Sequence, residues 1–346
     1  MKAIVLREFG GPEVLKPEHI ETPKPDPGEV LIQVHNVSVN VTLDILMRRG
    51  LHPYKPEFPH VLGVDPTGEV VALGHGVERP AVGERVAVHL HLRSPDCPSG
   101  QEAEDAGDGL IGIHRWGGYA EYITVPAENA FVIPEALSSA EACVVVRHLP
   151  TARHMLHKKA RLVAGETILV MGATGGLGSC CIQVAKRLGA TVIGAAGADD
   201  RVAKGIEFGA DYGINYRTQD LAEEVMKVTD GKGVDYAFEV FGSADTTKAA
   251  YEMTGKSGTV TVVGIAPVGA EAGINAVDMV RNEKTMRGTY YGSTQAAVDM
   301  PKLVDMYLSK KLNLDDLVVR QYSLDQINEA YGDMDNGEVG RGVIIF

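Results

Sequence analysis

The sequence predicts an α/β protein that has a β-rich first part and a doubly wound parallel sheet in the middle of the chain. Two observations support this fold class. Residues 1–150 carry short alternating or β-branched runs separated by turns. From residue 150 onward, helical and strand-like segments alternate, as in parallel βαβ units. Because 346 residues exceed what one hydrophobic core usually serves, we expect two domains.

The predicted strands of the first part are separated by segments rich in turn residues. Residues 23–28 read Pro-Lys-Pro-Asp-Pro-Gly, which is typical of a connector. Residues 92–112 are polar and acidic with little periodicity, and they are predicted as a surface excursion. The predicted strands are Ala3–Leu6, Glu29–Val37, Gly68–Leu73, Arg85–Val88 and Ala120–Val125.

The middle of the chain predicts alternating elements, and the pattern loosens after residue 290. The predicted helices are Thr151–Leu156, Ser179–Leu188, Asp200–Phe208, Leu221–Thr229 and Ala244–Met253. The predicted strands are Thr167–Met171, Thr191–Ala195, Tyr212–Asn215, Val234–Val240 and Thr259–Gly264. Further on we expect helices at Met300–Ser309 and Leu324–Met334 and a last strand at Gly342–Phe346.

A glycine-rich turn between the predicted strand Ile168–Met171 and the helix that follows is the most informative motif. Glycines there allow a tight turn and let the backbone approach a pyrophosphate, whose charge then lies at the helix N-terminus. Its position between a strand and a helix, with a second strand beyond, predicts a dinucleotide site. The expected cofactor-binding residues of the turn are Ala173, Thr174, Gly175, Gly176, Leu177 and Gly178, with Ala173 in place of the usual first glycine.

Composition and charge exclude several classes of partner. The net charge of −13 argues against nucleic acid or an anionic membrane surface. No apolar run approaches the ~18 residues of a membrane span, and the first residues do not read as a signal peptide. The four cysteines, Cys97, Cys143, Cys180 and Cys181, do not form a disulfide framework, so we expect a cytoplasmic protein.

Motifs along the whole chain resemble those of the medium-chain dehydrogenase/reductase superfamily, in the same order. The resemblance implies a GroES-like catalytic domain made from residues 1–149 and 291–346, and a Rossmann dinucleotide-binding domain over residues 150–290. It also implies an active site in the cleft between them. The motifs are residues 63–68 (Gly-Val-Asp-Pro-Thr-Gly), 82–86 (Val-Gly-Glu-Arg-Val), 117–122 (Gly-Gly-Tyr-Ala-Glu-Tyr), 173–178, 209–211 (Gly-Ala-Asp), 233–235 (Gly-Val-Asp) and 340–344 (Gly-Arg-Gly-Val-Ile).

The positions that hold zinc in the alcohol dehydrogenases of this superfamily are occupied by other residue types here. The catalytic-metal positions correspond to Asn40 or Val41, to Val64 and Asp65 within residues 63–65, and to Arg147. Only Asp65 among them could ligate, whereas zinc needs about three protein ligands. The positions of the structural zinc correspond to His91, Ser94, Cys97 and Asp105, with one thiolate left. We therefore expect no metal, and residues 63–68 and 43–50 are similar to the zinc-free quinone oxidoreductase and enoyl reductase branch.

The second strand of the predicted Rossmann domain favours NADP(H) over NAD. NAD sites carry an acidic residue about 20 positions after the glycines, where this chain has Ala196 and Gly197. The resemblance places Arg201 and Tyr216, with Arg217 beside it, where NADPH-dependent quinone reductases contact the 2′-phosphate. Asp199 and Asp200 are the alternative indication: turned inward, either would disfavour that phosphate, yet both could simply begin the next helix.

The resemblance implies further cofactor contacts. Thr151 and Leu177 are expected near the nicotinamide, and Arg341 near the pyrophosphate. Gly264 and Ile265 follow the strand that flanks the nicotinamide. A structural role remains open for Thr151, Leu177 and Arg341: an N-cap, a core residue and a solvated charge, respectively.

Without a metal to polarise an alcohol or carbonyl, we expect an acceptor that is already activated. Hydride would add to a quinone, or to the β-carbon of an α,β-unsaturated carbonyl, while a hydrogen-bond donor stabilises the charge on oxygen. The candidate catalytic residues are Asn40, Thr42, His52, Tyr54 and Arg147. Arg147 could equally pair with Asp65, and His52 could be a surface or packing residue.

Two alternatives remain open at this point. The chain could be an alcohol or aldehyde dehydrogenase of the same superfamily that works without zinc, or a non-catalytic NADPH-binding protein. In either case a small-molecule quinone, enone or carbonyl ligand is expected. By analogy with relatives that join two Rossmann sheets edge to edge, the strand-like segment Met286–Tyr291 predicts a homodimer.

Overall fold

A computed structural model describes residues 1–92, 109–289, 296–309, 312, 317–335 and 341–346. Within this described part, the chain divides into two compact units. Unit 1 comprises Met1–Pro150 and Thr294–Phe346, and unit 2 comprises Thr151–Ser293. The sequence prediction placed the corresponding boundaries at 149/150 and 290/291. Among the described residues, no helix is long and apolar enough to span a membrane.

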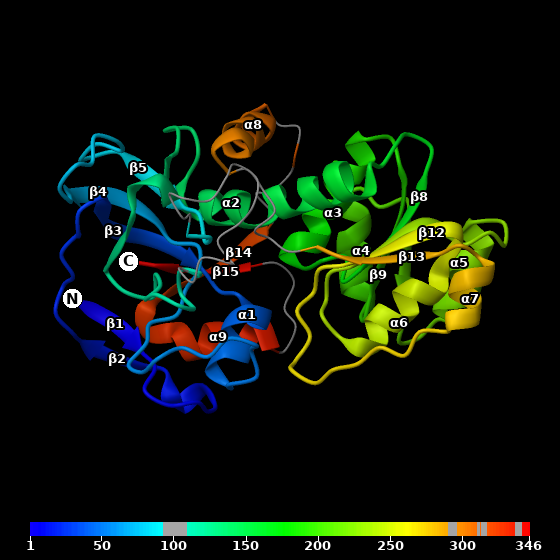
Figure 1. The fold of residues 1–346 in the computed structure, drawn as a ribbon, viewed down its shortest axis with the longest axis horizontal. Helices are drawn as coiled ribbons and strands as arrows, with labels where there is room; N and C mark the ends of the chain where they lie inside the picture. Colours follow the sequence, from blue (N-terminus) through cyan, green and yellow to red (C-terminus); the bar gives the residue numbers. More distant parts are fainter. Residues whose placement is uncertain (93–108, 290–295, 310–311, 313–316, 336–340) are drawn as a thin grey trace. The chain divides into compact units, whose positions relative to one another are not determined.

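Unit 2 is built on a parallel six-stranded sheet in the order β10-β9-β8-β11-β12-β13. The chain starts in the middle at β8, moves outward to β10, and returns to build the other half from β11 to β13, with helices on both faces (Figure 1). This is the doubly wound topology, whose switch point lies between β8 and β11. The strands are β8 (Thr167–Met171), β9 (Thr191–Ala196), β10 (Tyr212–Asn215), β11 (Val234–Glu239), β12 (Thr254–Val262) and β13 (Thr285–Gly288).

Three helices of unit 2 begin after a residue whose side chain caps the helix N-terminus. The Asp220 side chain accepts a hydrogen bond from the Glu223 amide at 3.0 Å, and Ser243 caps the next helix in the same way through Thr246. The helices are α3 (Gly176–Arg187), α4 (Asp199–Glu207), α5 (Leu221–Val228), α6 (Ala244–Met253) and α7 (Ala276–Arg281). The strands between them bury an apolar core that includes Leu169, Ile193, Ala237 and Val260.

Unit 1 has a mainly antiparallel sheet in the order β14-β15-β3-β4-β5-β7, with β6 paired to β3, and a separate β1–β2 hairpin. Strand β15 pairs with β3, for example Val343 with Ser38, so the end of the chain joins a sheet whose strands β3 to β7 lie within residues 29–132. The strands are β1 (Lys2–Val5), β2 (Lys16–His19), β3 (Glu29–Ser38), β4 (Thr67–Leu73), β5 (Arg85–Val88), β6 (Tyr122–Pro126), β7 (Ala130–Val132), β14 (Val318–Ser323) and β15 (Arg341–Ile345).

The helices of unit 1 surround this sheet. Helix α2 runs to Arg153 and continues as a π-helical turn over His154–Ala160, although Pro150 lies inside it. Helix α2 itself covers Ser139–Arg153. The other helices are α1 (Val41–Arg48), α8 (Ala296–Leu308) and α9 (Ile327–Asp335), and short 3₁₀ turns lie at Pro12–Val14, Ala127–Asn129 and Leu324–Gln326. Alternate residues of β3, β4, β5 and β6 form the sheet's core, with Ile32, Val70, Val86 and Ile123 buried.

The predicted fold class is confirmed, and most predicted elements lie within a few residues of those observed. Helix α2 is the largest difference, because the prediction began at Thr151 and the helix begins at Ser139. Its run Cys143–Val146 is buried, and three of the four residues are β-branched valines, so it shows neither helical periodicity nor high helix propensity. The prediction also missed α1, α7, β2, β7 and β14.

Candidate functional site

The glycine turn of unit 2 leads from β8 into α3, as a dinucleotide site requires. Gly172 has a φ of +88°, which favours glycine, and Gly175 is the N-cap of α3. A methyl group on Gly178 would lie 2.1 Å from the Gly172 carbonyl oxygen, so only glycine lets α3 pack this close to the turn. The backbone amides at the helix N-terminus can then face a pyrophosphate.

The other residues of the glycine turn differ in how far they are buried. Ala173 and Thr174 are buried beneath the turn, Leu177 is half-buried, and Gly175 is exposed. A methyl group on Gly175 would approach nothing closer than 3.6 Å, the Gly172 carbonyl oxygen. The surrounding protein therefore leaves room for a larger side chain at position 175, in contrast to position 178.

A phenol and a guanidinium from the segment after β10 lie over Gly197, which follows β9, where NAD sites usually carry an acidic residue. A methyl group on Gly197 would lie 3.0 Å from the Tyr216 hydroxyl and 3.2 Å from Nε of Arg217, so both side chains lie over Gly197. Ala196 is buried, and its carbonyl oxygen accepts a hydrogen bond from the Tyr216 amide at 3.1 Å. Arg201 is half-buried in α4.

The Asp199 side chain is hydrogen-bonded to a residue of β10. The sequence analysis gave this aspartate as an indication against NADP(H). The Asn215 side-chain amide donates a hydrogen bond to Oδ1 of Asp199 at 2.6 Å. Asn215 is buried at the end of β10, so it fixes this carboxylate at the first turn of α4. Asp200 is exposed on the same turn.

Glu239, the last residue of β11, accepts several hydrogen bonds at the carboxyl end of this inner strand. The sequence analysis did not single it out. Its Oε1 accepts hydrogen bonds from the amides of Phe241 and Gly242 at 3.0 and 2.8 Å and from the Thr246 hydroxyl at 2.8 Å. Burial raises the pKa of Glu239. Its backbone carbonyl accepts from the Gly264 amide at 3.1 Å, so one residue links the turn after β11 to the segment after β12.

The remaining predicted cofactor contacts are placed as follows. Gly264 and Ile265 are half-buried after β12, and a methyl group on Gly264 would lie 2.2 Å from the Gly242 amide nitrogen. Thr151 is 4% exposed, and its hydroxyl has no hydrogen-bond partner in the described part of the protein. Arg341 begins β15, and its side chain lies outside the described residues.

The catalytic-metal positions of unit 1 are filled by a hydrogen-bonded carboxylate and an apolar side chain. Both oxygens of Asp65 accept hydrogen bonds, from the Ser38 amide at 3.0 Å, the Ser38 hydroxyl at 2.5 Å and the Asn40 side-chain amide at 3.1 Å. Val64 is fully buried. These residues do not fit a metal ion: the carboxylate is already satisfied, and valine offers no ligand atom.

No cluster of metal-ligating side chains is evident elsewhere in the segments that the structure describes. Among these residues, no group of three or more His, Cys, Asp or Glu side chains could hold a metal ion. Of the positions that correspond to the structural zinc, His91 is buried, whereas Ser94, Cys97 and Asp105 lie outside the described residues.

A second buried carboxyl group, Asp44, extends the network around Asn40 and was not predicted. Its Oδ2 accepts hydrogen bonds from the Tyr119 hydroxyl at 2.6 Å and the Asn40 amide at 3.1 Å. The Tyr331 hydroxyl donates to that of Tyr119 at 3.4 Å. Burial, chiefly, raises the pKa of Asp44 to about 7, with the charge of Asp65 adding to the effect. Asn40 is thus engaged on both sides, by Asp44 and by Asp65.

The loop after α1 places an imidazole and a phenol beside a histidine of a distant segment. Nδ1 of His52 accepts a hydrogen bond from the Tyr54 amide at 3.2 Å, so in the neutral ring the proton is on Nε2. Within the segments that the structure describes, that Nε2 is buried and has no hydrogen-bond partner. The Tyr54 ring lies 5.7 Å from the His52 ring and 4.8 Å from the His114 ring. Thr42 belongs to α1, and its side chain lies outside the described residues.

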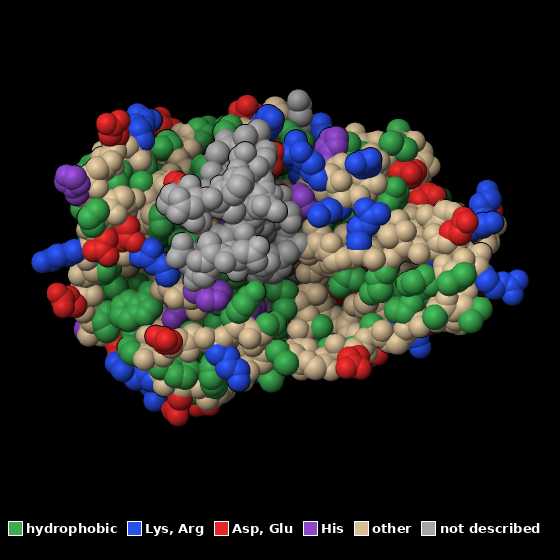
Figure 2. All heavy atoms as spheres, viewed as in Figure 1, with side chains coloured by type: hydrophobic (Ala, Val, Ile, Leu, Met, Phe, Trp, Pro, Cys, Tyr) green, Lys and Arg blue, Asp and Glu red, His purple; other side chains and the backbone are tan. Residues whose placement is uncertain are grey.

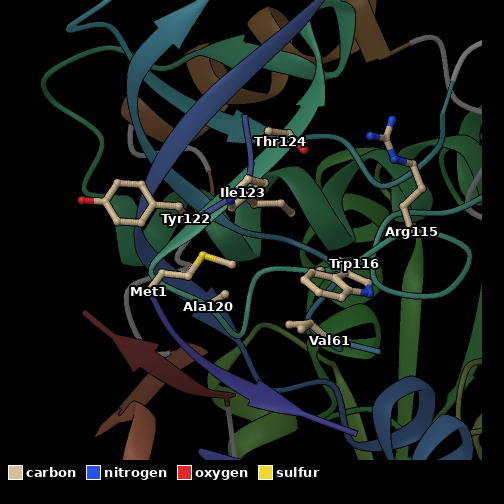
Figure 3. A pocket seen from close by; sticks show the side chains of 10 residues that line it. Met1, Val61, Arg115, Trp116, Ala120, Tyr122, Ile123 and Thr124 are labelled. Atoms are coloured by element: carbon tan, nitrogen blue, oxygen red, sulfur yellow. The ribbon is translucent and has the colours of Figure 1, made fainter. Parts of the chain in front are cut away.

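A separate pocket of about 230 Å³ lies in unit 1 (Figure 3). Two of its polar groups are already engaged, because Arg115 pairs with Glu29 at 2.5 Å and the indole of Trp116 donates to the Pro59 carbonyl oxygen at 3.0 Å. The pocket presents a largely apolar lining, including Val61 and Ile123, and no arrangement suited to hydride or proton transfer.

Comparisons with known proteins agree with this architecture. A family profile described as "Alcohol dehydrogenase GroES-like domain" matches residues 26–135, and one described as "Zinc-binding dehydrogenase" matches residues 176–309. The chain is 30% identical over 357 residues to an NAD-dependent alcohol dehydrogenase of Sulfurisphaera tokodaii, covering 100% of both chains. It is 31% identical over 337 residues to an L-threonine 3-dehydrogenase of Pyrococcus abyssi, covering 94% and 93%.

Among solved structures, a quinone oxidoreductase of Pseudomonas syringae pv. Tomato DC3000 matches with a TM-score of 0.84. The identity is 28%, and the match covers 100% of this chain and 99% of that one. A GroES-like unit combined with a Rossmann-like parallel sheet defines the class of two-domain oxidoreductases that use a pyridine nucleotide. The chain belongs to the medium-chain dehydrogenase/reductase superfamily.

We expect Gly178→Ala to reduce stability and Gly175→Ala to weaken cofactor binding. The Gly178 methyl group must displace backbone, so this variant should lose about 3 kcal/mol in the free energy of unfolding. Gly175→Ala should fold normally but bind the dinucleotide about tenfold more weakly, because its methyl group faces the approaching pyrophosphate. Thermal unfolding followed by circular dichroism, together with cofactor titration, measures both. Equal stability of the two variants would contradict this packing argument.

We expect Asp44 to make stability depend on pH between about 4 and about 7. The pKa is raised in the folded state, so folding favours the protonated carboxyl. Its stabilisation is therefore complete below the unfolded-state pKa of about 3.8 and is lost as pH rises through about 7. Relative to Asp44→Asn, the parent protein should lose up to about 1.4 kcal/mol per pH unit across that window and show no further change above it.

The measurement is urea unfolding across this pH range, followed by fluorescence of Trp116, the single tryptophan of the chain and a residue of unit 1. Asp26→Asn, which changes an exposed aspartate in the same unit, is the matched control. If the difference between the parent and Asp44→Asn does not vary with pH, Asp44 is ionised in the folded protein and the assignment is wrong.

Proposed function

We propose that this protein is a zinc-independent, NADPH-dependent oxidoreductase that transfers hydride to a quinone or an α,β-unsaturated carbonyl. The observation that carries the proposal is the state of the metal positions. Val64 is buried, and Asp65 is fully engaged with Ser38 and Asn40, so these positions offer a metal no ligand set. An acceptor that is already polarised by conjugation needs only alignment and a hydrogen-bond donor.

His52 is the favoured donor among the candidates Asn40, Thr42, His52, Tyr54 and Arg147. In the neutral ring its Nε2 carries the proton, and among the described residues no hydrogen-bond partner engages that buried N–H. The amide of Asn40, by contrast, already donates to Asp65. NADPH, when bound, would supply the hydride that the reaction needs. His52 would hydrogen-bond the oxygen of the enolate that forms, and a proton from water would complete the saturated carbonyl.

NADP(H) is the proposed cofactor because of the side chains around Gly197. The Arg217 guanidinium and the Tyr216 hydroxyl lie where a 2′-phosphate is expected, and the Asp199 carboxylate is held by Asn215. Arginine suits bidentate phosphate binding. The NAD-dependent alcohol dehydrogenase named above makes NAD(H) the alternative.

We further propose a homodimer formed at the edge of the unit 2 sheet and a cytoplasmic location. In the described part of the chain, β13 pairs with β12 alone, and Met286 on it is partly exposed. The preceding helix α7 exposes Val277 and Val280 by 66% and 77%. An unpaired strand edge beside exposed apolar side chains is suited to pairing with a second copy. Tyr290 and Tyr291, which complete the predicted edge segment, lie outside the described residues.

Turnover assays test the proposed activity. We expect the purified protein to oxidise NADPH with 1,4-benzoquinone or cinnamaldehyde, without bound zinc and without inhibition by 1,10-phenanthroline, because no step uses a metal. Elemental analysis and absorbance at the NADPH band measure both properties. Alcohol-dependent reduction of NAD⁺ or NADP⁺ that is abolished by chelation would favour the dehydrogenase alternative. Tight NADPH binding without turnover of any acceptor would favour the non-catalytic alternative.

Arg217→Gln should separate the two cofactors. We expect NADPH affinity to fall about tenfold, because a charge-assisted hydrogen bond to the 2′-phosphate is lost, whereas NADH affinity should not change. Arg281→Gln, which removes an exposed arginine of the same unit, is the matched control. Cofactor fluorescence titrations give all the dissociation constants. Equal losses for NADPH and NADH would refute a phosphate contact at Arg217.

A further inference from the structure

Glu239 is a buried carboxyl group at the carboxyl end of β11, between β8 and β12. It pairs with Met171 of β8 on one side and with Val262 of β12 on the other. Acidic side chains (red) are scattered over the surface of the face shown in Figure 2, whereas Glu239 is fully buried. In the part of the chain that the structure describes, its Oε2 has no hydrogen-bond partner. A buried carboxyl oxygen without a partner costs free energy, so the presence of Glu239 at this position requires an explanation.

The other oxygen of Glu239, Oε1, holds the turn that follows β11. It accepts hydrogen bonds from the amides of Phe241 and Gly242 at 3.0 and 2.8 Å, and from the Thr246 hydroxyl at 2.8 Å. Thr246 lies in the first turn of α6. One oxygen atom therefore joins the end of the strand, the turn and the start of the next helix.

The same carboxyl group lies against the segment that follows β12. A methyl group on Gly264 would lie 2.8 Å from Oε2 of Glu239 and 2.2 Å from the Gly242 amide nitrogen. A methyl group on Gly242 would lie 2.6 Å from the Ile265 carbonyl oxygen. The two glycines thus pack backbone to backbone beside Glu239. The turn after β11 and the segment after β12 form one closely packed wall.

This wall lies at the switch point of the sheet. In a doubly wound sheet, a dinucleotide binds outside the carboxyl ends of the strands where the strand order reverses, here between β8 and β11. The turn after β11 lies beside the glycine turn after β8, because a methyl group on Gly172 would lie 3.3 Å from Cβ of Phe241. The Phe241 side chain is 52% exposed. Glu239 therefore supports the backbone that borders the expected dinucleotide site, while its own side chain stays buried.

The position of Glu239 in the sheet indicates which half of the cofactor this wall faces. A doubly wound sheet consists of two halves, each of which receives one mononucleotide. The half formed by β8, β9 and β10 carries the glycine turn and the proposed 2′-phosphate contacts over Gly197, so it is assigned to the adenosine mononucleotide. The half formed by β11, β12 and β13 is then assigned to the nicotinamide mononucleotide. Glu239 belongs to this second half.

We propose that Glu239 is a positioning residue for the nicotinamide half of the cofactor. Its carboxyl group holds the turn after β11 and the segment after β12 in the arrangement that receives this half, so little ordering is needed on binding. This inference rests on the proposed function for the identity of the cofactor, but it depends on no acceptor. Loss of the carboxyl group should weaken binding of the whole dinucleotide and leave binding of its adenosine half unchanged.

Calorimetric titration of the full chain with NADPH and with adenosine 2′,5′-bisphosphate tests this proposal. The second probe is the adenosine half of NADPH and lacks the nicotinamide. We expect Glu239→Met to bind NADPH about tenfold more weakly, because the Phe241 and Gly242 amides lose their acceptor, and to bind the bisphosphate as the parent does. Loss of a negative charge alone would favour both anionic probes, so weaker NADPH binding reports the lost hydrogen bonds.

Three further variants separate positioning from a general loss of structure. Glu239→Gln keeps a side-chain oxygen that can accept the same hydrogen bonds and should bind NADPH within about threefold of the parent. Thr246→Val removes one hydrogen bond to Oε1 and should weaken NADPH binding about threefold, which tests the proposal even if Glu239→Met does not fold. Glu252→Gln, which changes an exposed glutamate of α6, is the matched control and should leave both affinities unchanged.

The possible outcomes are distinct. Parent-like NADPH affinity in folded Glu239→Met, or in Thr246→Val if Glu239→Met does not fold, overturns the proposal. Equal losses for NADPH and the bisphosphate also overturn it, because the defect is then a general one. If Glu239→Gln binds NADPH as weakly as Glu239→Met, the hydrogen bonds to Oε1 are not the cause and the assignment is wrong.

Failure of the proposed cofactor gives a different result from failure of the Glu239 assignment. If the parent protein binds NADH and not NADPH, the NADP(H) proposal fails, and the same variants titrated with NADH and 5′-AMP test Glu239. If the parent binds neither NADPH nor NADH, the proposed function fails and the role of Glu239 fails with it. If the parent binds NADPH and the variants show no selective loss, only the role of Glu239 is overturned.

Discussion

The buried charge of Asp65 is the constraint on which the arrangement of unit 1 depends. A carboxylate that is 1% exposed must be compensated, and here three hydrogen bonds from Ser38 and Asn40 do so. These bonds tie the end of β3 and the start of α1 to the segment before β4. The backbone amide of Asn40 also donates a hydrogen bond to Asp44. The Asp44 carboxyl group accepts a further hydrogen bond from the Tyr119 hydroxyl. Asn40 therefore joins two buried carboxyl groups in one hydrogen-bonded network.

Much of the fold and part of the site could be predicted from sequence. Strands β5, β8 and β10 and helix α6 have the predicted bounds, because local alternation or helical periodicity coincides with burial there. The glycine turn was equally visible, since its backbone geometry admits few residue types. Helix α2 was mostly missed, because a helix buried on all sides carries no amphipathic signal.

The site was less predictable where it depends on partners far apart in the chain. Asp44 and Tyr119 both stand in motifs that the sequence analysis quoted, residues 43–50 and 117–122, yet nothing local shows that their side chains meet. The hydrogen bond between Asn215 and Asp199 also joins residues that are separated in the sequence. It matters for the choice between NADP(H) and NAD(H), because it restrains the Asp199 carboxylate. His114 drew no attention in the sequence, because its proximity to Tyr54 arises only from the pairing of His91 with Leu110.

The pairing of β15 with β3 has a consequence for how the protein is made. Unit 2 is one uninterrupted stretch, so it can acquire its fold while the ribosome is still adding residues behind it. Unit 1 must wait, since the strand beside β3 is the last to be synthesised. Until then β3 has an unpaired edge on that side, and the emerging chain depends on a contact that spans almost its entire length.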